Sequence, residues 1–174
     1  MDDQQVISLY EDTRHLANIA VWAVALQVKR LGAEEPDFAD FPHQPLVDFH
    51  FLVTALTQVR QLAEALTAID EMQPTIEEAI QSFDREVPQL RAIRNVLEHI
   101  GDYARGCGRN KAVLYEGLFT IVLDPDCIKW LNYELRPRAA LAASEALFNV
   151  IREKPPTAYA RAAESHRNDC PARA

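Results

Sequence analysis

Residues 51–69, FLVTALTQVRQLAEALTAI, repeat apolar side chains at the spacing of a helix in a bundle. The repeat alternates steps of four and three residues through Leu52, Leu56, Val59, Ala63, Leu66 and Ile69. Because an α-helix turns once in about 3.6 residues, these side chains all lie along one face. Other helices must cover such a face, so the stretch predicts a helical bundle.

Similar periodicity, together with the positions of proline and glycine, predicts four more helices. Gly32 suits the end of a long first helix, and Pro45 and Pro137 suit the first turns of later ones. Thr75 followed by Glu78 predicts a capping box at another helix start. The five predicted helices cover residues 3–31, 45–69, 76–86, 88–105 and 137–153.

One region has the composition of strands. Residues 112–123 and 127–134 are rich in β-branched, aromatic and other apolar side chains. They flank Asp124-Pro125-Asp126, which is a favourable turn sequence. We therefore predict a β-hairpin near residues 118–133, with a single helix over residues 126–153 as the alternative.

The predicted elements make one mainly α-helical domain. A chain of 174 residues, 48% of them hydrophobic, is long enough to bury one core. We expect the domain to span residues 1–153, with a proline-containing linker or ordered loop at residues 33–45. Residues 154–174 begin with Lys154-Pro155-Pro156 and turn polar and alanine-rich, which predicts a flexible C-terminal tail.

Charge, hydropathy and cysteine content narrow the functional classes. A net charge of −8 disfavours a broad nucleic-acid surface but leaves room for a local basic patch. The longest apolar run, residues 16–26, is too short for a membrane span. Cys107, Cys127 and Cys170 form no CxxC pair, so neither a disulfide framework nor a zinc site is predicted, and the cytoplasm is the expected location.

Residues 94–99, Arg94-Asn95-Val96-Leu97-Glu98-His99, carry the side chains best suited to chemistry. An arginine can hold a phosphate, a histidine can transfer a proton near neutral pH, and an asparagine can orient either one. On a helical wheel His99 borders the apolar face and lies about 140° from Arg94, which points toward solvent. We therefore expect the two side chains to meet across a groove or across a two-fold dimer interface.

An ordinary structural explanation stands beside this one. Arg94 and Glu98 are four residues apart on the predicted helix and can form an ion pair of the kind common on helix surfaces. Asp102 lies three residues after His99 and can pair with it. On this explanation the motif stabilises a helix surface and takes no part in catalysis.

The pattern Arg94-Asn95-x-x-x-His99 resembles the motif of HEPN domains, which are small all-helical domains. Many members of that family are metal-independent ribonucleases that act as dimers, with the arginine and histidine at the dimer cleft, and others bind nucleotides. The resemblance implies that Arg94 holds the scissile phosphate, His99 acts as acid and base, and Asn95 positions His99 or the ribose. Nearby basic residues are then expected to bind RNA: Arg91, Arg105, Arg109 and Lys111. No cofactor is implied.

Two other functions remain open. The apolar faces of the first two helices could support a homodimer, so the chain could be a non-catalytic interaction module. His15, His50 and His99 lie on three separate predicted helices, which could gather them into a metal site. No HxxxH or ExxH pair supports that site, so we predict no metal ligand.

Overall fold

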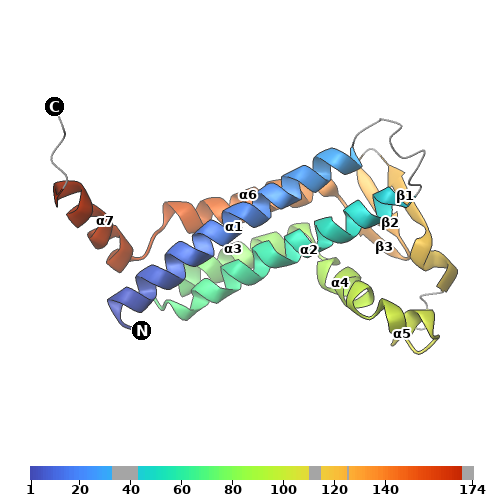
Figure 1. Ribbon diagram of the computed structural model, residues 1–174, viewed down its shortest axis with the longest axis horizontal. Coiled ribbons are helices and arrows are strands. Elements are labelled where there is room, and N and C mark those ends of the chain that lie inside the picture. The colour runs from blue at the N-terminus through green and yellow to red at the C-terminus, as the bar shows by residue number, and fades with distance from the viewer. Residues whose placement is uncertain (33–42, 110–114, 125, 170–174) are drawn as a thin grey trace.

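The computed structural model describes residues 1–32, 43–109, 115–124 and 126–169 (Figure 1). Within them, four long helices run side by side as a bundle: α1 (Asp3–Leu31), α2 (Gln44–Ala65), α3 (Gln73–Glu86) and α6 (Pro137–Glu153). Both α1 and α3 pack on α2 and on α6. A small sheet lies at one end of the bundle and α7 (Thr157–Asp169) at the other. The predicted mainly α-helical fold is confirmed; most of the predicted linker, residues 33–42, lies outside the described part.

The predicted seam of α2 lies at the centre of the core. Its six members are each at most 3% exposed: Leu52, Leu56, Val59, Ala63, Leu66 and Ile69. α2 itself ends at Ala65, and the seam continues through a 3-10 turn, η2 (Leu66–Ala68). Across the bundle, the buried Tyr10 hydroxyl of α1 donates a hydrogen bond of 3.0 Å to the carbonyl oxygen of Ile151 at the end of α6. The seam prediction is therefore confirmed.

α3 begins earlier than predicted. Its first residue is Gln73, and no side chain hydrogen-bonds to its N-terminal backbone. The predicted capping box between Thr75 and Glu78 is wrong, because both residues lie inside the helix. Pro74 fixes a helical φ in the first turn, so the helix has already started before Thr75.

The helix predicted over residues 88–105 is interrupted at His99. α4 (Leu90–Glu98) ends there, and α5 (Ile100–Ala104) begins one residue later. The His99 backbone leaves the helical region, with φ −109° and ψ 22°. Gly101 favours such an interruption because glycine has a low helix propensity. The buried Tyr103 ring anchors the second piece.

The predicted β-hairpin is confirmed, and the alternative helix over residues 126–153 is wrong. β1 (Ile121–Asp124) pairs antiparallel with β2 (Cys127–Trp130). β2 also pairs with β3 (Tyr133–Leu135), a strand that the sequence did not predict. The tight β2–β3 connection places Leu131 at φ 56°. Residues 115–119 belong to the stretch whose composition predicted a strand, but they form a second 3-10 turn, η3 (Tyr115–Phe119), and the first strand begins only at Ile121.

Trp130 fixes this sheet against the bundle. Its side chain is 1% exposed and packs against Phe49 of α2, with ring centroids 5.7 Å apart. The indole N–H donates a hydrogen bond of 3.1 Å to the carbonyl oxygen of Leu118. The sheet thus closes one end of the core.

The C-terminal stretch predicted to be a flexible tail contains α7. The Tyr159 ring of α7 packs on Tyr10 of α1, with centroids 4.7 Å apart. Thr157 donates hydrogen bonds from its backbone and side chain to Glu71, at 2.8 and 2.6 Å. The polar composition suggested a loose tail, but the aromatic contact and the buried Ala158 hold the start of α7 on the bundle.

Candidate functional site

The sequence motif lies on α4, which packs against α2. Ile93 and Val96 are buried and form the inner side of α4. Arg94 and Asn95 flank that side, and His99 follows the last helical residue. The motif therefore stands on a short, well-packed helix whose two flanks are open to solvent.

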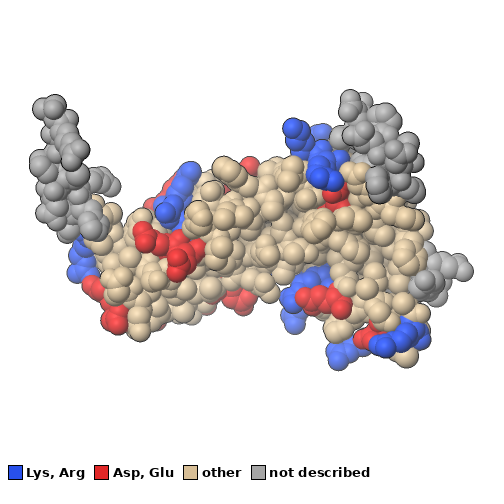
Figure 2. Space-filling model, viewed as in Figure 1, with Lys and Arg blue, Asp and Glu red and all other residues tan. Residues whose placement is uncertain are grey.

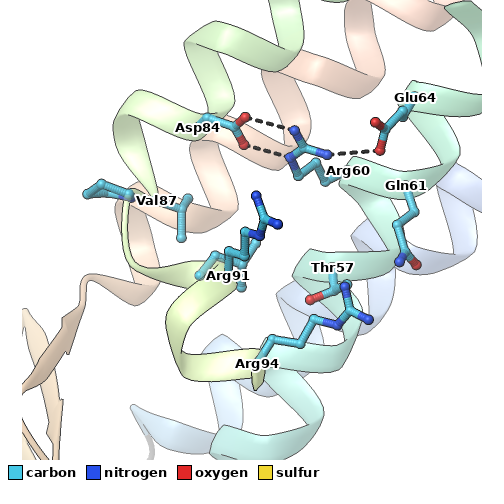
Figure 3. A pocket seen from close by; sticks show the side chains of 10 residues that line it. Thr57, Arg60, Gln61, Glu64, Asp84, Val87, Arg91 and Arg94 are labelled. Atoms are coloured by element: carbon cyan, nitrogen blue, oxygen red, sulfur yellow. Dashed lines mark hydrogen bonds and ion pairs between the residues drawn. The ribbon is translucent and has the colours of Figure 1, made fainter. Parts of the chain in front are cut away.

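One flank of α4 forms a pocket with α2. Its volume is about 500 Å³, and Arg60, Arg91 and Arg94 contribute to its lining together with Thr57 and Gln61. Figure 3 shows the Arg91 side chain extending toward Arg60, and the Arg94 side chain extending from α4 toward Thr57. We call this space the arginine pocket.

Two of these three arginines are held by carboxylates. Arg60 donates to Asp84 from Nε at 2.8 Å and from Nη2 at 3.0 Å, and to Glu64 from Nη1 at 3.0 Å (Figure 3). The hydrogen bonds to Asp84 raise the pKa of Arg60. Arg94 Nη2 lies 2.7 Å from Glu98 Oε1, whereas Arg91 has no ion pair with any described residue. Three carboxylates thus pair with two of the guanidinium groups, and Arg91 is the lining arginine left to attract an anion among the described residues.

The other flank of α4 forms a second pocket, which we call the histidine pocket. Its volume is about 430 Å³, and its lining includes Asn95, His99, Tyr103 and Arg109. Gly108 also lines it and lies against the Tyr103 ring, where no side chain would fit without a shift. The pocket combines a proton-transfer group, an amide and a cation.

His99 is more accessible than the helical wheel predicted. Its side chain is 63% exposed, and the helix ends at this residue. His99 still lines one pocket with the buried Val96 and Tyr103, so it lies at the edge of the core as the wheel predicted, although the continuous helix does not hold. His99 Nδ1 lies 3.6 Å from Asp102 Oδ2, and Arg105 Nη2 lies 2.6 Å from Asp102 Oδ1, so one carboxylate faces both residues.

Arg94 and His99 do not share a pocket within one protomer. Arg94 lines the arginine pocket, whereas Asn95 and His99 line the histidine pocket, and α4 lies between the two. Both Arg94 and His99 also have the carboxylate neighbours that the ordinary structural explanation predicts. A site that uses both side chains on one phosphate therefore needs a second protomer or a rearrangement.

The predicted RNA-binding residues divide between the two flanks. Arg91 lines the arginine pocket, Arg109 lines the histidine pocket, and Arg105 is paired with Asp102. Lys111 lies outside the described residues. The sequence analysis missed Arg60 and Gln61 of α2, because nothing local showed that α2 would lie beside α4. The i,i+4 pair of Arg60 and Glu64 was the only signal near them.

The three histidines weighed as metal ligands lie on separate elements. His15 is exposed on α1, His50 lies on α2 against the Trp130 ring, and His99 follows α4. Among the described residues, no group of three or more His, Cys, Asp or Glu side chains is arranged to hold a metal ion. Burial lowers the pKa of His50, and its Nε2 atom is buried without a hydrogen-bond partner in the described part of the chain.

No family model, no curated protein and no solved structure matches this chain. Within the described residues, none of the helices combines the length and apolar character that a membrane span requires. Function is therefore inferred from the residues themselves, above all from the two pockets that flank α4.

Proposed function

We propose that this protein is a HEPN-like domain that binds and cleaves RNA as a homodimer in the cytoplasm. The observation that carries the proposal is the placement of the motif on α4. Arginines line one open flank of this short helix, and Asn95 and His99 line the other. The exposed Cys107 and half-buried Cys127 are free thiols, which suits a reducing compartment.

The proposed chemistry needs no metal ion. Arg94, supported by Arg91, holds the scissile phosphate after exchanging Glu98 for the phosphate oxygens. His99 removes the proton from the ribose 2′-hydroxyl, and the 2′-oxygen bonds to the adjacent phosphorus as the P–O5′ bond breaks. The departing 5′-oxygen takes up the proton that His99 removed, which leaves a 2′,3′-cyclic phosphate. Asp102 lies 3.6 Å from Nδ1 and can pair with the ring once the ring is protonated, and Nε2 carries the proton transfer. Asn95 lines the same pocket and contacts the ribose or His99.

The separation of Arg94 from His99 makes the dimer part of the proposal. Since the two side chains open into different pockets of one protomer, Arg94 acts with His99 of the partner subunit. A two-fold dimer would then hold two equivalent sites.

RNA cleavage in the presence of a chelator tests this function. Wild type is expected to cleave tRNA or mixed RNA, and His99→Ala and Arg94→Ala are each expected to lose about 100-fold or more of that rate. Arg138→Ala is the matched control, because Arg138 is an 81% exposed arginine outside both pockets. Equal cleavage by wild type and the two motif variants, or no cleavage by wild type, would contradict the proposal.

A second candidate function is a non-catalytic dimerisation module. Large apolar side chains on the outer side of α1 favour it, above all Trp22, which is 71% exposed. The ordinary ion pairs of Arg94 and His99 also fit this candidate. It predicts a dimer that leaves RNA intact, so the cleavage assay separates the two functions.

A further inference from the structure

The outer side of α1 carries a row of exposed apolar side chains, which we call the α1 stripe. Leu16 is 50% exposed, Ile19 51%, Trp22 71% and Leu26 53%. Their spacing of three and four residues puts them on one side of the helix. Scattered exposed apolar residues are ordinary on protein surfaces, but a continuous row that includes a tryptophan marks an interaction surface.

α2 carries two more exposed apolar side chains close to the end of α1. Arg30 near the end of α1 contacts Asp48 near the start of α2 at 2.9 Å, so the two helix ends are adjacent. Val47 and Phe51 flank Asp48 on α2 and are 49% and 57% exposed. In the view of Figure 2, few charged side chains lie over the middle of α1 and α2.

The exposed area is the right size for a dimer. The exposed parts of these six apolar residues amount to roughly 700 Å² per protomer, so pairing two copies can bury at most about 1,400 Å² from them. Specific protein–protein interfaces bury about 1,200–2,000 Å² in total. Trp22 at the centre of the stripe is the type of residue that contributes most to such interfaces.

The order of residues along α1 matches an antiparallel pairing of two copies. Leu16 and Leu26 are spaced evenly about the middle of the stripe, at residues 20–21, and so are Ile19 and Trp22. Glu11 and Lys29 are centred within one residue of the same point and lie about five turns apart, hence on one side of the helix. A two-fold axis through that point places Glu11 opposite Lys29 of the partner subunit. Neither has an ion pair with another described residue of its own chain.

We propose that the α1 stripe, with Val47 and Phe51, is the surface on which a second copy of this chain docks, with the two α1 helices antiparallel. Pairing covers the six apolar side chains and joins each acidic end of α1 to a basic end of the other. The inference rests on the homodimer of the proposed function and names a surface through which two copies pair. On α2, the exposed Gln58 follows Phe51 by seven residues and so lies on the same side of the helix. The exposed Gln61, three residues further along α2, lines the arginine pocket.

Mass measurement in solution tests the docking surface. Light scattering during size-exclusion chromatography is expected to give wild type a mass of twice 19.7 kDa. It should give Trp22→Asp a mass of 19.7 kDa, with an unchanged circular dichroism spectrum. Val122→Asp is the control, since Val122 is 48% exposed on β1 and should leave the dimer intact. A monomeric wild type, or a Trp22→Asp variant that still dimerises, would overturn the proposal. No RNA is involved, so failure here is distinct from failure of RNA cleavage.

Charge reversal tests the antiparallel register. Glu11→Lys and Lys29→Glu alone are each expected to raise the dimer dissociation constant about tenfold, because each places like charges opposite one another. The double variant restores the pair with its signs exchanged and should return to within about threefold of wild type. A double variant as weak as the two singles would rule out this register.

Discussion

Arg94 Nη2 lies 2.7 Å from Glu98 Oε1, one turn along α4, and Arg94 lines a different pocket from His99. The arginine of the motif is thus occupied by a carboxylate in the free protein. Any phosphate that reaches Arg94 must compete with Glu98. The side chain of Arg94 is 37% exposed, so the exchange needs no opening of the core.

Glu98→Gln is therefore expected to strengthen RNA binding. Removal of the carboxylate frees Arg94, and we predict about two- to fivefold tighter binding of tRNA at low salt. The measurement is a fluorescence anisotropy titration in a His99→Ala background, where cleavage does not interfere. Glu145→Gln, which changes the net charge equally at an exposed site on α6, should leave the affinity near its starting value. Unchanged or weaker binding by Glu98→Gln would show that Arg94 does not hold RNA.

The ion pair between Arg30 and Asp48 contributes to stability because only one partner is buried. The Asp48 side chain is 2% exposed, and Arg30 Nε lies 2.9 Å from its Oδ1 atom. Arg30→Ala leaves a buried carboxylate without a cation, and we expect it to lower the free energy of unfolding by about 2–4 kcal/mol. Adding Asp48→Asn should recover part of that loss, because the amide carries no charge. Urea unfolding at fixed protein concentration measures both effects.

Arg152→Ala is the control for that pair. Arg152 is 56% exposed and contacts Glu153 at 3.4 Å, so its removal should cost less than about 0.5 kcal/mol. Equal effects of Arg30→Ala and Arg152→Ala would mean that the burial of Asp48 carries no energetic consequence.

His50 is expected to make the fold sensitive to mild acid. Burial lowers its pKa below the ordinary value of 6.5, so the unfolded chain takes up a proton before the folded chain does. Stability contributed by neutral His50 is complete above pH 6.5, falls as the pH drops below 6.5, and stops falling below the folded-state pKa. Wild type should lose more stability between about pH 7.5 and about pH 5.5 than His50→Gln does.

Urea unfolding at several pH values checks this prediction. His43→Gln, at an exposed histidine before α2, should keep the wild-type pH dependence. If His50→Gln and wild type show the same pH slope, His50 is not responsible for the acid sensitivity.

Removal of residues 155–174 is expected to weaken the bundle without unfolding it. The truncated chain loses the Tyr159–Tyr10 ring contact and the two hydrogen bonds from Thr157 to Glu71. We expect a loss of about 1–2 kcal/mol of unfolding free energy, with the helical circular dichroism of the remaining chain retained. Tyr159→Ala should reproduce much of this loss, whereas Arg161→Ala, which removes an exposed ion pair with Asp3, should not. No change in stability on truncation would mean that α7 does not pack on α1.

The elements that depend on local pattern were predictable from the sequence. The α2 seam follows from the spacing of its own side chains, and α6 begins and ends where Pro137 and Lys154-Pro155-Pro156 indicated. The hairpin followed from strand-forming residues around a turn sequence. Each of these signals lies within the element that it predicts.

The features that depend on distant contacts were not predictable. Arg60 and Asp84 are 24 residues apart in sequence and meet only because α3 lies beside α2. Tyr159 of α7 packs against Tyr10, which lies near the opposite end of the sequence. The break at His99 places the motif histidine in solvent, and a wheel that assumes one continuous helix cannot show it. β3 has only three residues, too few for a periodic signal.

The central claim is that Arg94 of one protomer acts with His99 of the other, and mixing two inactive variants tests it directly. Arg94→Ala and His99→Ala are each expected to be inactive alone. When the two are mixed and allowed to exchange subunits, each mixed dimer regains one site with both side chains intact, so RNA cleavage should return to roughly a quarter of the wild-type rate. If the mixture stays as inactive as its components while wild type cleaves and the subunits exchange, a site shared between protomers is contradicted.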